Sequence, residues 1–511
     1  MKSILLFILF WLLILTEPVF SQGDFNPGKL LRMDPDYQNV VIPPNIAPMN
    51  FRVLTEGASY KLQLKSSQGK PIVLQNKSGL FQFSEDAWHQ MLQANKGEKL
   101  YYEITIYDRY RSPVLQSTIT NSIAKEEIDG YLVYRLLNWQ FSTYSSGTIG
   151  IFQRNLANFD EIRIFQAKDR TGGEGTCVNC HSFARNNPNP MVIHVRNATY
   201  GKPMLVAKNG TVTHFDKTGG LLAWHPDGRL LTYAVNKFSL LIHTAGRSND
   251  IFDGGGDLYL LDVDSNEIIT SEKISSPDFL ETWPAWSPDG RYLYFCRTPK
   301  ISSERFREIK YDLVRISYDT ASKKWGELET VLTAKETGMS IGQPRISPDG
   351  RYLMFCLFAY GSSQGTQPES DLFLLDLTTR KFNPLTIANS DRTESWHCWS
   401  SNGRWFVFSS KRRDGLLTRP HISYFDSSGN AHKPFIVPQK DPSIYDTTLK
   451  MYNLPELITG PVPVDFRDFY NALFHPQHKV VPTGQVVDKQ LQSTHQDEGS
   501  PHLSPYGRAK N

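Results

Sequence analysis

Several common functional signals are absent from this chain of 511 residues. Apart from residues 4–15, no segment is apolar enough to span a bilayer, which excludes a protein with many membrane spans. The formal net charge is only +3, so neither nucleic acid nor an anionic membrane surface is expected as a partner. A Gly-rich phosphate loop, a nucleophile elbow and a His-Glu-x-x-His motif are also missing, so no nucleotide, esterase-type or zinc-protease site is indicated.

The N-terminus is typical of a secretory signal peptide. Lys2 supplies positive charge, residues 4–15 are an apolar run, and Val19-Phe20-Ser21 offers a cleavage site before Gln22. The run is shorter than the roughly 20 residues that a spanning helix needs, although an uncleaved anchor is the alternative. We therefore expect residues 1–21 to be removed, and the mature chain to be periplasmic or secreted without a transmembrane anchor.

The segment GTCVNCHSF at residues 175–183 contains the most specific chemical motif of the chain. Cys177 and Cys180 flank two residues, and His181 follows at once. Two thiols at this spacing can add to the vinyl groups of a porphyrin, and the adjacent imidazole can reach the iron. A thioredoxin-like dithiol would need a βαβ context, and a zinc site would need a second cysteine pair nearby; both are missing. The motif predicts one covalently attached haem c with His181 as the proximal iron ligand.

Two residues after the motif are candidates for the distal iron ligand. Met191 and His194 would face opposite sides of a strand, so at most one of them can reach the same iron, and we favour His194. Each can instead be an ordinary strand residue. A methionine or histidine in this position favours electron transfer, whereas an open position favours binding or activation of small molecules. The other cysteines, Cys296, Cys356 and Cys398, are expected to be small buried apolar residues.

Internal repeats occupy the second half of the chain. Four segments align: LLAWHPDGRLLTYAV, WPAWSPDGRYLYFCR, QPRISPDGRYLMFCL and WHCWSSNGRWFVFSS, with turn glycines Gly228, Gly290, Gly350 and Gly403. Each segment has an apolar approach, a tight turn and an alternating apolar run, which predicts a β-hairpin. A further strand, a polar turn and a return strand follow each hairpin. Four short antiparallel strands in each repeat are typical of a β-propeller blade.

The W-S-P-D-G-R hairpins resemble TolB-like (PD40) propeller repeats, most strongly over residues 215–437. The resemblance implies a ring of five or six blades at 191–475, and it says little about activity because propellers host unrelated functions. A single Cys-x-x-Cys-His motif before such a ring resembles a family of exported bacterial proteins. That resemblance implies a periplasmic propeller that carries haem.

Three further segments complete the expected organisation of a mainly β protein. Residues 38–125 contain short alternating strands at close intervals, which predict an immunoglobulin- or fibronectin-like sandwich. Residues 126–190 are expected to connect the sandwich to the propeller and to carry the haem-attachment motif. Residues 480–511 are polar and poor in apolar side chains, so we expect a disordered tail.

A second site is possible at the mouth of the propeller channel, because residues just before the blade turns reach it. Two blades share the pattern E-[T/S]-W-x-x-W, and further polar residues occupy nearby columns of the repeat. The candidates are Glu281, Trp283, Gln343, Glu394, Trp396 and His397. Such convergent groups can bind a ligand or ion. The alternative is that Trp286 and Trp399 pack between blades while the carboxylates bind backbone amides.

Three functions follow from this combination. The favoured one is a periplasmic monohaem c-type electron carrier whose propeller docks a redox partner. The second is a TolB-like envelope scaffold that recruits an envelope protein and in which haem is structural or sensory. The third is a haem-dependent oxidoreductase with an open distal site. The identity of the partner does not follow from the residues, and nucleic acid is not expected.

Overall fold

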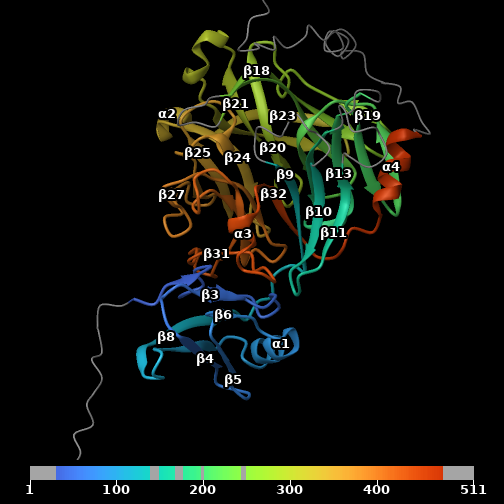
Figure 1. Ribbon diagram of the computed structural model, residues 1–511. Helices are drawn as coiled ribbons and strands as arrows, with labels where there is room; N and C mark the ends of the chain where they lie inside the picture. Colours follow the sequence, from blue (N-terminus) through green and yellow to red (C-terminus); the bar gives the residue numbers. More distant parts are fainter. Residues whose placement is uncertain (1–29, 139–148, 167–176, 197–200, 243–248, 476–511) are drawn as a thin grey trace, which may run out of the picture.

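The computed structural model describes residues 30–138, 149–166, 177–196, 201–242 and 249–475 (Figure 1). The predicted signal peptide and tail lie outside these residues. The chain is mainly β, and its N-terminal unit lies beside a larger ring of sheets (Figure 1). No helix among the described ranges is long and apolar enough to cross a membrane.

The N-terminal unit is the expected β-sandwich. One sheet has the order β2-β8-β7-β4-β5 and the other has the order β1-β3-β6. The strands are β1 (Met33–Asp34), β2 (Val41–Ile42), β3 (Phe51–Val53), β4 (Ser59–Lys65), β5 (Ile72–Asn76), β6 (Leu80–Phe81), β7 (Lys99–Tyr107) and β8 (Pro113–Ile123). Burial alternates along β4, as the strand period requires. Helix α1 (Glu85–Ala94) buries Trp88, Met91 and Leu92 in the core.

Six four-stranded sheets follow among the described residues, and they form the blades of a propeller. The first blade contains β9 (Tyr131–Asn138), β10 (Gly150–Asn155), β11 (Glu161–Gln166) and β32 (Lys450–Ile458). The second contains β12 (Cys177–Ala184), β13 (Asn187–Arg196), β14 (Met204–Lys208) and β15 (Thr211–Phe215). The third contains β16 (Gly220–Trp224), β17 (Leu230–Ile242), β18 (Asn249–Asp262) and β19 (Glu267–Ile269).

The remaining blades come from the clearest sequence repeats. The fourth contains β20 (Phe279–Trp286), β21 (Tyr292–Pro299), β22 (Asp312–Asp319) and β23 (Lys324–Leu332). The fifth contains β24 (Ser340–Ile346), β25 (Tyr352–Phe358), β26 (Asp371–Asp376) and β27 (Phe382–Pro384). The sixth contains β28 (Glu394–Trp399), β29 (Trp405–Ser410), β30 (Arg419–Tyr424) and β31 (Phe435–Ile436). The innermost strands contact one another in the order β12, β16, β20, β24, β28, β32 and back to β12, so the ring is closed.

The ring closes by pairing the two ends of the propeller chain. Strand β32 pairs antiparallel with β9, with Tyr452 opposite Leu136 and Leu457 opposite Leu132. The propeller therefore begins near Tyr131 rather than at the predicted boundary of 191. Residues 126–190 are not a separate connecting segment, because they supply three strands of the first blade and the innermost strand of the second.

The repeat turns have the conformation that their glycines suggested. Gly228, Gly290, Gly350 and Gly403 have φ values of 68°, 74°, 74° and 65°, a region that residues with a Cβ rarely adopt. In the fourth blade Ser287 Oγ donates to Asp289 Oδ1 at 2.6 Å, and the same oxygen accepts the Arg291 amide at 3.0 Å. The carboxylate thus fixes the turn between the first and second strands of the blade.

All six innermost strands carry a bulge at the same place. Two residues are skipped in the pairing with the second strand, and the bulges lie between Val178/His181, Gly220/Ala223, Thr282/Ala285, Gly342/Arg345, Ser395/Cys398 and Asn453/Glu456. In five blades the first skipped residue has a positive φ: Leu221, Trp283, Gln343, Trp396 and Leu454, at 48° to 55°. In β12 the skipped residues are Asn179 and Cys180. Bulges re-aim side chains, and the two residues skipped in β12, Asn179 and Cys180, both line the cavity at the ring axis.

The sandwich and the sixth blade share one hydrophobic core. Trp405, Val407 and Ile422 belong to the same buried cluster as the sandwich side chains. Trp405 Nε1 also donates to the Glu126 carbonyl at 3.2 Å. The Arg413 guanidinium binds both carboxylate oxygens of Asp34 at 2.8 Å. The two units are therefore joined by packing as well as by the chain.

The few helices outside the sandwich are short. They are η3 (Ser303–Glu308), α2 (Ala334–Thr337), η4 (Gln364–Thr366), α3 (Ile444–Thr447) and α4 (Phe466–Phe474). Helix α4 is capped by Asp465, whose side chain accepts the Arg467 and Asp468 amides. It packs on β11, β14 and β15, at the outer side of the first and second blades (Figure 1).

Candidate functional site

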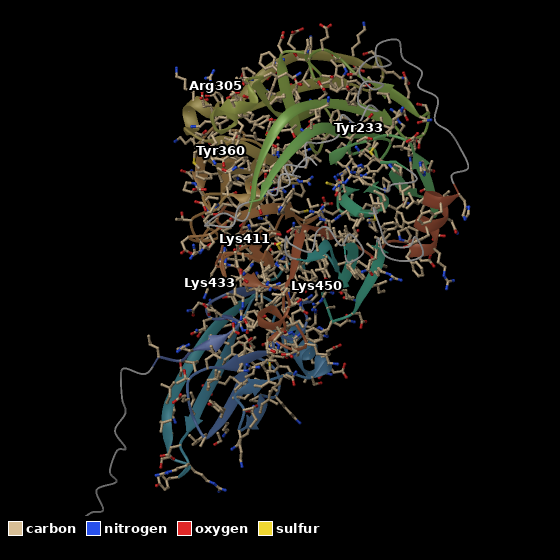
Figure 2. All side chains as sticks on the ribbon, turned by 45° about the horizontal axis from the view of Figure 1, so that its top comes forward. Tyr233, Arg305, Tyr360, Lys411, Lys433 and Lys450 are labelled. Atoms are coloured by element: carbon tan, nitrogen blue, oxygen red, sulfur yellow. The ribbon has the colours of Figure 1, made fainter. Side chains whose placement is uncertain are left out.

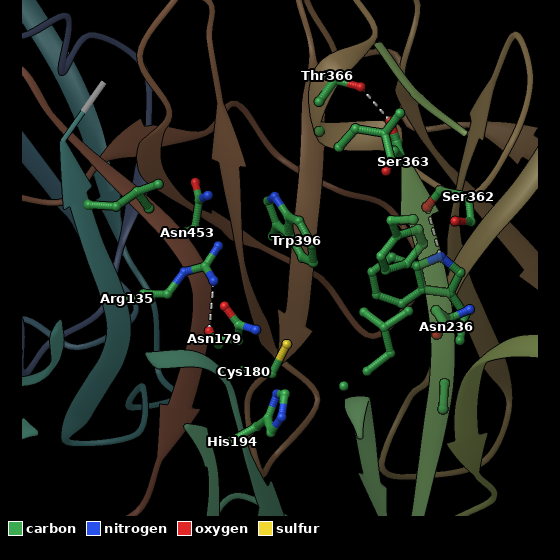
Figure 3. Close-up of a pocket in the computed structure, with 18 of the residues that line it drawn as sticks. Arg135, Asn179, Cys180, His194, Asn236, Ser362, Ser363, Thr366, Trp396 and Asn453 are labelled. Atoms are coloured by element: carbon green, nitrogen blue, oxygen red, sulfur yellow. Dashed lines mark hydrogen bonds between the residues drawn. The ribbon is translucent and has the colours of Figure 1, made fainter. Parts of the chain in front are cut away.

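A cavity of about 620 Å³ lies at the centre of the ring. Its walls contain residues from every blade or from the loop that follows its strands, so it occupies one end of the propeller channel. This volume falls within the roughly 300–1,000 Å³ of small-molecule and cofactor sites. Figure 3 shows the cavity with Cys180 and His194 on one side and Trp396 beyond them.

The wall formed by the second blade brings a thiol and an imidazole together. Cys180 packs against the core between the second and third blades, and a Cβ built on Gly220 would lie 3.9 Å from its Sγ. His194 is opposite Met204 of the same core, so its ring faces the same side of the sheet as Cys180 (Figure 3). The Cys177 backbone begins β12, but its side chain lies outside the described residues.

The His194 ring is buried at the wall of the cavity. It is 4% exposed, and neither ring nitrogen has a hydrogen-bond partner among the described residues. The Lys202 backbone lies near the ring without reaching hydrogen-bond geometry. Burial, with a smaller contribution from the Arg196 charge, lowers the pKa of His194 to about 3. The imidazole is therefore neutral at neutral pH and has lone-pair capacity that no group in the described part of the chain uses.

His181 lies on the other face of the same sheet. It is opposite Ile193, and Phe183 is opposite Met191; these apolar residues form the core between the first and second blades. The ring is buried near the backbones of Leu454 and Val133, with neither nitrogen hydrogen-bonded. Burial, then the charges of Arg135 and Arg345, lower the pKa of His181 to about 3. This imidazole does not line the cavity.

The predicted iron ligands are therefore not brought together as expected. His181 and His194 face opposite sides of the second blade, because one is at the bulge of β12 and the other is opposite Met204. Met191 shares the side of His181 and is fully buried in the apolar core. Of the predicted haem residues with described side chains, Cys180 and His194 line the cavity.

All charged residues that line the cavity within the described ranges are basic. They are Arg135, Arg196, Lys202 and Lys411. Arg135 Nη1 donates to the Asn179 carbonyl at 2.9 Å, and Arg196 Nη2 donates to Asn179 Oδ1 at 3.1 Å. Lys411 is only 7% exposed, and burial lowers its pKa to about 8 although Asp414 opposes this. Nothing in the sequence marked Arg135 or Lys411, because the equivalent positions of other blades hold other residue types; Asn236, for example, occupies the position of Lys411 in the third blade.

Two of the predicted channel residues line the cavity. Trp283 and Trp396 both occupy bulge positions, and their ring centroids are 5.5 Å apart. The Trp283 indole donates to the Ser362 carbonyl at 2.9 Å, which fixes its orientation. The pair forms an aromatic side of the cavity opposite the second blade.

The other predicted channel residues are engaged in blade packing and do not line the cavity. Glu281 accepts a hydrogen bond from Arg297 Nε at 3.1 Å, and burial raises its pKa to about 7 despite that partner. Glu394 accepts from the Ser410 hydroxyl at 2.7 Å.

The Gln343 and His397 side chains are likewise used inside the ring. Gln343 Oε1 accepts the Trp396 amide at 2.8 Å, and His397 Nε2 lies 3.1 Å from the Met354 carbonyl oxygen. The second tryptophan of each E-[T/S]-W-x-x-W pattern packs between blades, which is the alternative given for Trp286 and Trp399 in the sequence analysis. Trp286 donates to Thr232 Oγ1 of the preceding blade, and Trp399 donates to the Arg345 carbonyl of its own preceding blade.

Cys296 and Cys356 are fully buried, as predicted, and burial raises the pKa of both thiols. Cys398 is partly exposed. Within the described residues, no group of three or more His, Cys, Asp or Glu side chains is arranged to hold a metal ion. The cavity chemistry is therefore that of one thiol, one free imidazole, basic groups and indoles.

No family model matches this chain, and no curated protein matches it. Among solved structures, an oligogalacturonate lyase in complex with manganese is 15% identical, with a TM-score of 0.33 over 59% of this chain and 72% of that chain. Prolyl oligopeptidase B from Galerina marginata is 10% identical, with a TM-score of 0.33; the match covers 66% of this chain and 42% of that one.

Hydrazine synthase of Kuenenia stuttgartiensis is 14% identical, with a TM-score of 0.29 over 48% of this chain and 63% of that chain. This chain thus spans less than half of the prolyl oligopeptidase and less than two thirds of the hydrazine synthase chain. Similarities this low carry no argument about activity. The assignment of the propeller rests on the order and closure of the sheets described above.

Proposed function

We propose that the central cavity holds one haem c, attached through thioether bonds to Cys177 and Cys180, and that the protein is an exported monohaem electron carrier. The observation that supports this most is the His194 imidazole, which is buried beside Cys180 with both nitrogens unpartnered. A buried polar group left without a partner costs about 1–3 kcal/mol. Binding a metal would offset that cost. The haem, when bound, supplies one-electron chemistry at its iron.

The residues of the cavity fit such a group with one change from the sequence prediction. Cys180 and His194 share the cavity wall, whereas His181 lies behind the sheet. We therefore favour His194 over His181 as the protein ligand on the cavity side. Trp283 and Trp396 would cover the opposite side and exclude water. The basic side chains that line the cavity would balance negative charge on the bound haem.

The decisive experiment is haem attachment in a competent periplasm. The full chain, exported from cells with haem-attachment machinery, is expected to give a pyridine haemochrome spectrum with one haem per chain. Cys177→Ser and Cys180→Ser should each disturb attachment, and the double variant should abolish it. Cys398→Ser is the matched control, because this residue, like Cys180, is partly buried but lies outside the cavity wall. Colourless wild-type protein with free Cys177 and Cys180 thiols would contradict the proposal.

Redox behaviour separates the electron carrier from the other two functions. Reversible one-electron cycling without carbon monoxide binding supports electron transfer. Carbon monoxide binding by the ferrous protein would point instead to a haem-dependent oxidoreductase with an open coordination position. A haem that stays in one redox state over the physiological range of potentials would favour the TolB-like envelope scaffold.

A further inference from the structure

The side of the cavity formed by the sixth and first blades presents hydrogen-bond donors without matching acceptors. Arg135 and Asn453 are opposite each other in the β9–β32 pair and lie side by side (Figure 3). Thr418 Oγ1 donates to Asn453 Oδ1 at 2.6 Å, which leaves the Asn453 amide hydrogens without a partner among the described residues. Lys411 lies on the same side, just after β29, whose last residue is opposite Arg419 of β30. Arg135, Asn453, Thr418 and Lys411 all line the cavity, and we call these four residues the strip.

The positive charge of this strip is only partly balanced by the described part of the chain. The Asp414 carboxylate acts on the Lys411 ammonium, but within the described ranges no Asp or Glu lines the cavity. Arg135 Nε is buried and has no hydrogen-bond partner. Burying an unpaired cation is costly, and the lowered pKa of Lys411 expresses that cost. An anion with acceptor oxygens would satisfy both groups at once.

We propose that Arg135, Lys411 and Asn453 form a carboxylate-binding wall, and that its ligand carries the carboxylate on a flat apolar body. The carboxylate follows from the donors, since charge-assisted hydrogen bonds to Arg and Lys are the strong ones. The flat apolar body follows from the neighbouring lining, which includes Leu137, Ile149, Met451 and the Trp396 ring. Indole faces pack well against flat apolar groups.

Two sources share this ligand chemistry. One is a propionate of the haem, in which case the inference rests on the proposed function. The other is a free aromatic acid that enters the cavity by itself. Benzoate is a suitable probe for both cases, because benzamide has the same size and shape without the charge. Binding can be followed by calorimetry and by the fluorescence of the cavity tryptophans.

The probe is titrated into two forms of the same full chain: protein with attached haem, and protein exported from cells that lack the attachment machinery. Benzoate binding at least tenfold tighter than benzamide in both forms would identify a free acid as the ligand. If benzoate binds at least tenfold tighter than benzamide in the haem-free form alone, the haem propionates are the ligand of this wall. Equal affinity for both probes, or no saturable binding in either form, would overturn the carboxylate wall.

Substitutions locate the binding to the strip. Lys411→Met is expected to weaken benzoate binding about tenfold and to leave benzamide binding unchanged, and Arg135→Gln provides an independent second variant. Lys450→Met is the matched control, because this exposed lysine lies near Lys411 but does not line the cavity (Figure 2). Equal losses in Lys411→Met and Lys450→Met would contradict the proposal. A haemochrome spectrum of each sample shows separately whether haem attachment has failed.

Discussion

Cys180 and His181 are adjacent in the chain, yet their side chains lie on opposite faces of the sheet of the second blade. Cys180 borders the central cavity, whereas His181 is buried against the first blade. Successive side chains of a strand point to opposite faces, and the bulge of β12 decides which one faces the cavity. Because of the bulge, Val178 and His181 lie on the same side, against the core between the first and second blades. Cys180 and His181 of the Cys-x-x-Cys-His motif are therefore separated by a layer of backbone.

The first prediction concerns the iron ligand. In haem-loaded protein, His194→Ala should change the ferric and ferrous absorption spectra, and added imidazole should restore them, because a small ligand can replace the missing ring. His181→Ala should leave both spectra close to those of the wild type. Optical and electron paramagnetic resonance spectra measure this, with haemochrome assays as a check on attachment. Altered spectra in His181→Ala alone would show that the motif histidine is the ligand.

The second prediction concerns the buried lysine. Burial lowers the pKa of Lys411 from 10.5 to about 8, so the charged form opposes folding at neutral pH. Lys411→Met in haem-free protein should therefore raise the free energy of unfolding by about 3 kcal/mol at pH 7. Wild-type stability should recover as the pH rises from about 8 toward 10.5, because only the unfolded chain is then still protonated at this group. Thermal unfolding of the wild type and of Lys411→Met at pH 7 and pH 10 tests this. The difference in stability between the two proteins should be smaller at pH 10.

The third prediction concerns the strand that closes the ring. Leu457 in β32 is fully buried opposite Leu132 of β9. Leu457→Ala should lower the free energy of unfolding by about 2–5 kcal/mol, as expected for a cavity in a packed core. Leu449→Ala, one residue before the strand and 73% exposed, should change it by less than about 0.5 kcal/mol. Denaturant unfolding followed by fluorescence measures both, and similar losses would show that closure does not depend on this packing.

The fourth prediction concerns the union of sandwich and propeller. Trp405 is fully buried in the cluster that spans both units. Trp405→Ala should lower the melting temperature of both units together by removing about 3–5 kcal/mol of stability. Hydrogen exchange of α1 is the readout, because this helix belongs to the sandwich whereas Trp405 belongs to the sixth blade. Unchanged exchange in α1 would mean that the two units unfold independently.

Much of the fold follows from the turn residues, which can be recognised in the sequence. The four Pro-Asp-Gly-type turns require a positive φ at one residue, so their glycines mark the hairpins wherever they occur. The turn of the second blade could not be recognised in this way, because it contains Arg185 and Asn186 in place of a glycine, with φ values of 52° and 60°. The first blade could not be recognised either, because its innermost strand comes from residues 450–458, far from β9 in the chain.

The candidate site was only partly predictable, because some of its residues repeat from blade to blade and others do not. Trp283 and Trp396 repeat at equivalent positions, so the pattern placed them near the channel. Arg135 and Lys411 have no basic counterpart at the equivalent positions of the third blade, Ala234 and Asn236, and only ring closure brings the two to one cavity. The facing of His181 depended on a bulge that alternation along an ordinary strand does not predict.

The last strand of the ring also sets an order of events for a chain that emerges from its N-terminus. Tyr131 to Asn138 must wait for residues 450–458 before the first blade has its full set of neighbours. Until then the circle has a gap directly beside the blade that carries Cys180. The proposed haem would have room to approach that thiol sideways through the gap during this interval. Once the final strand has docked, β32 lies against β12 and fills the gap.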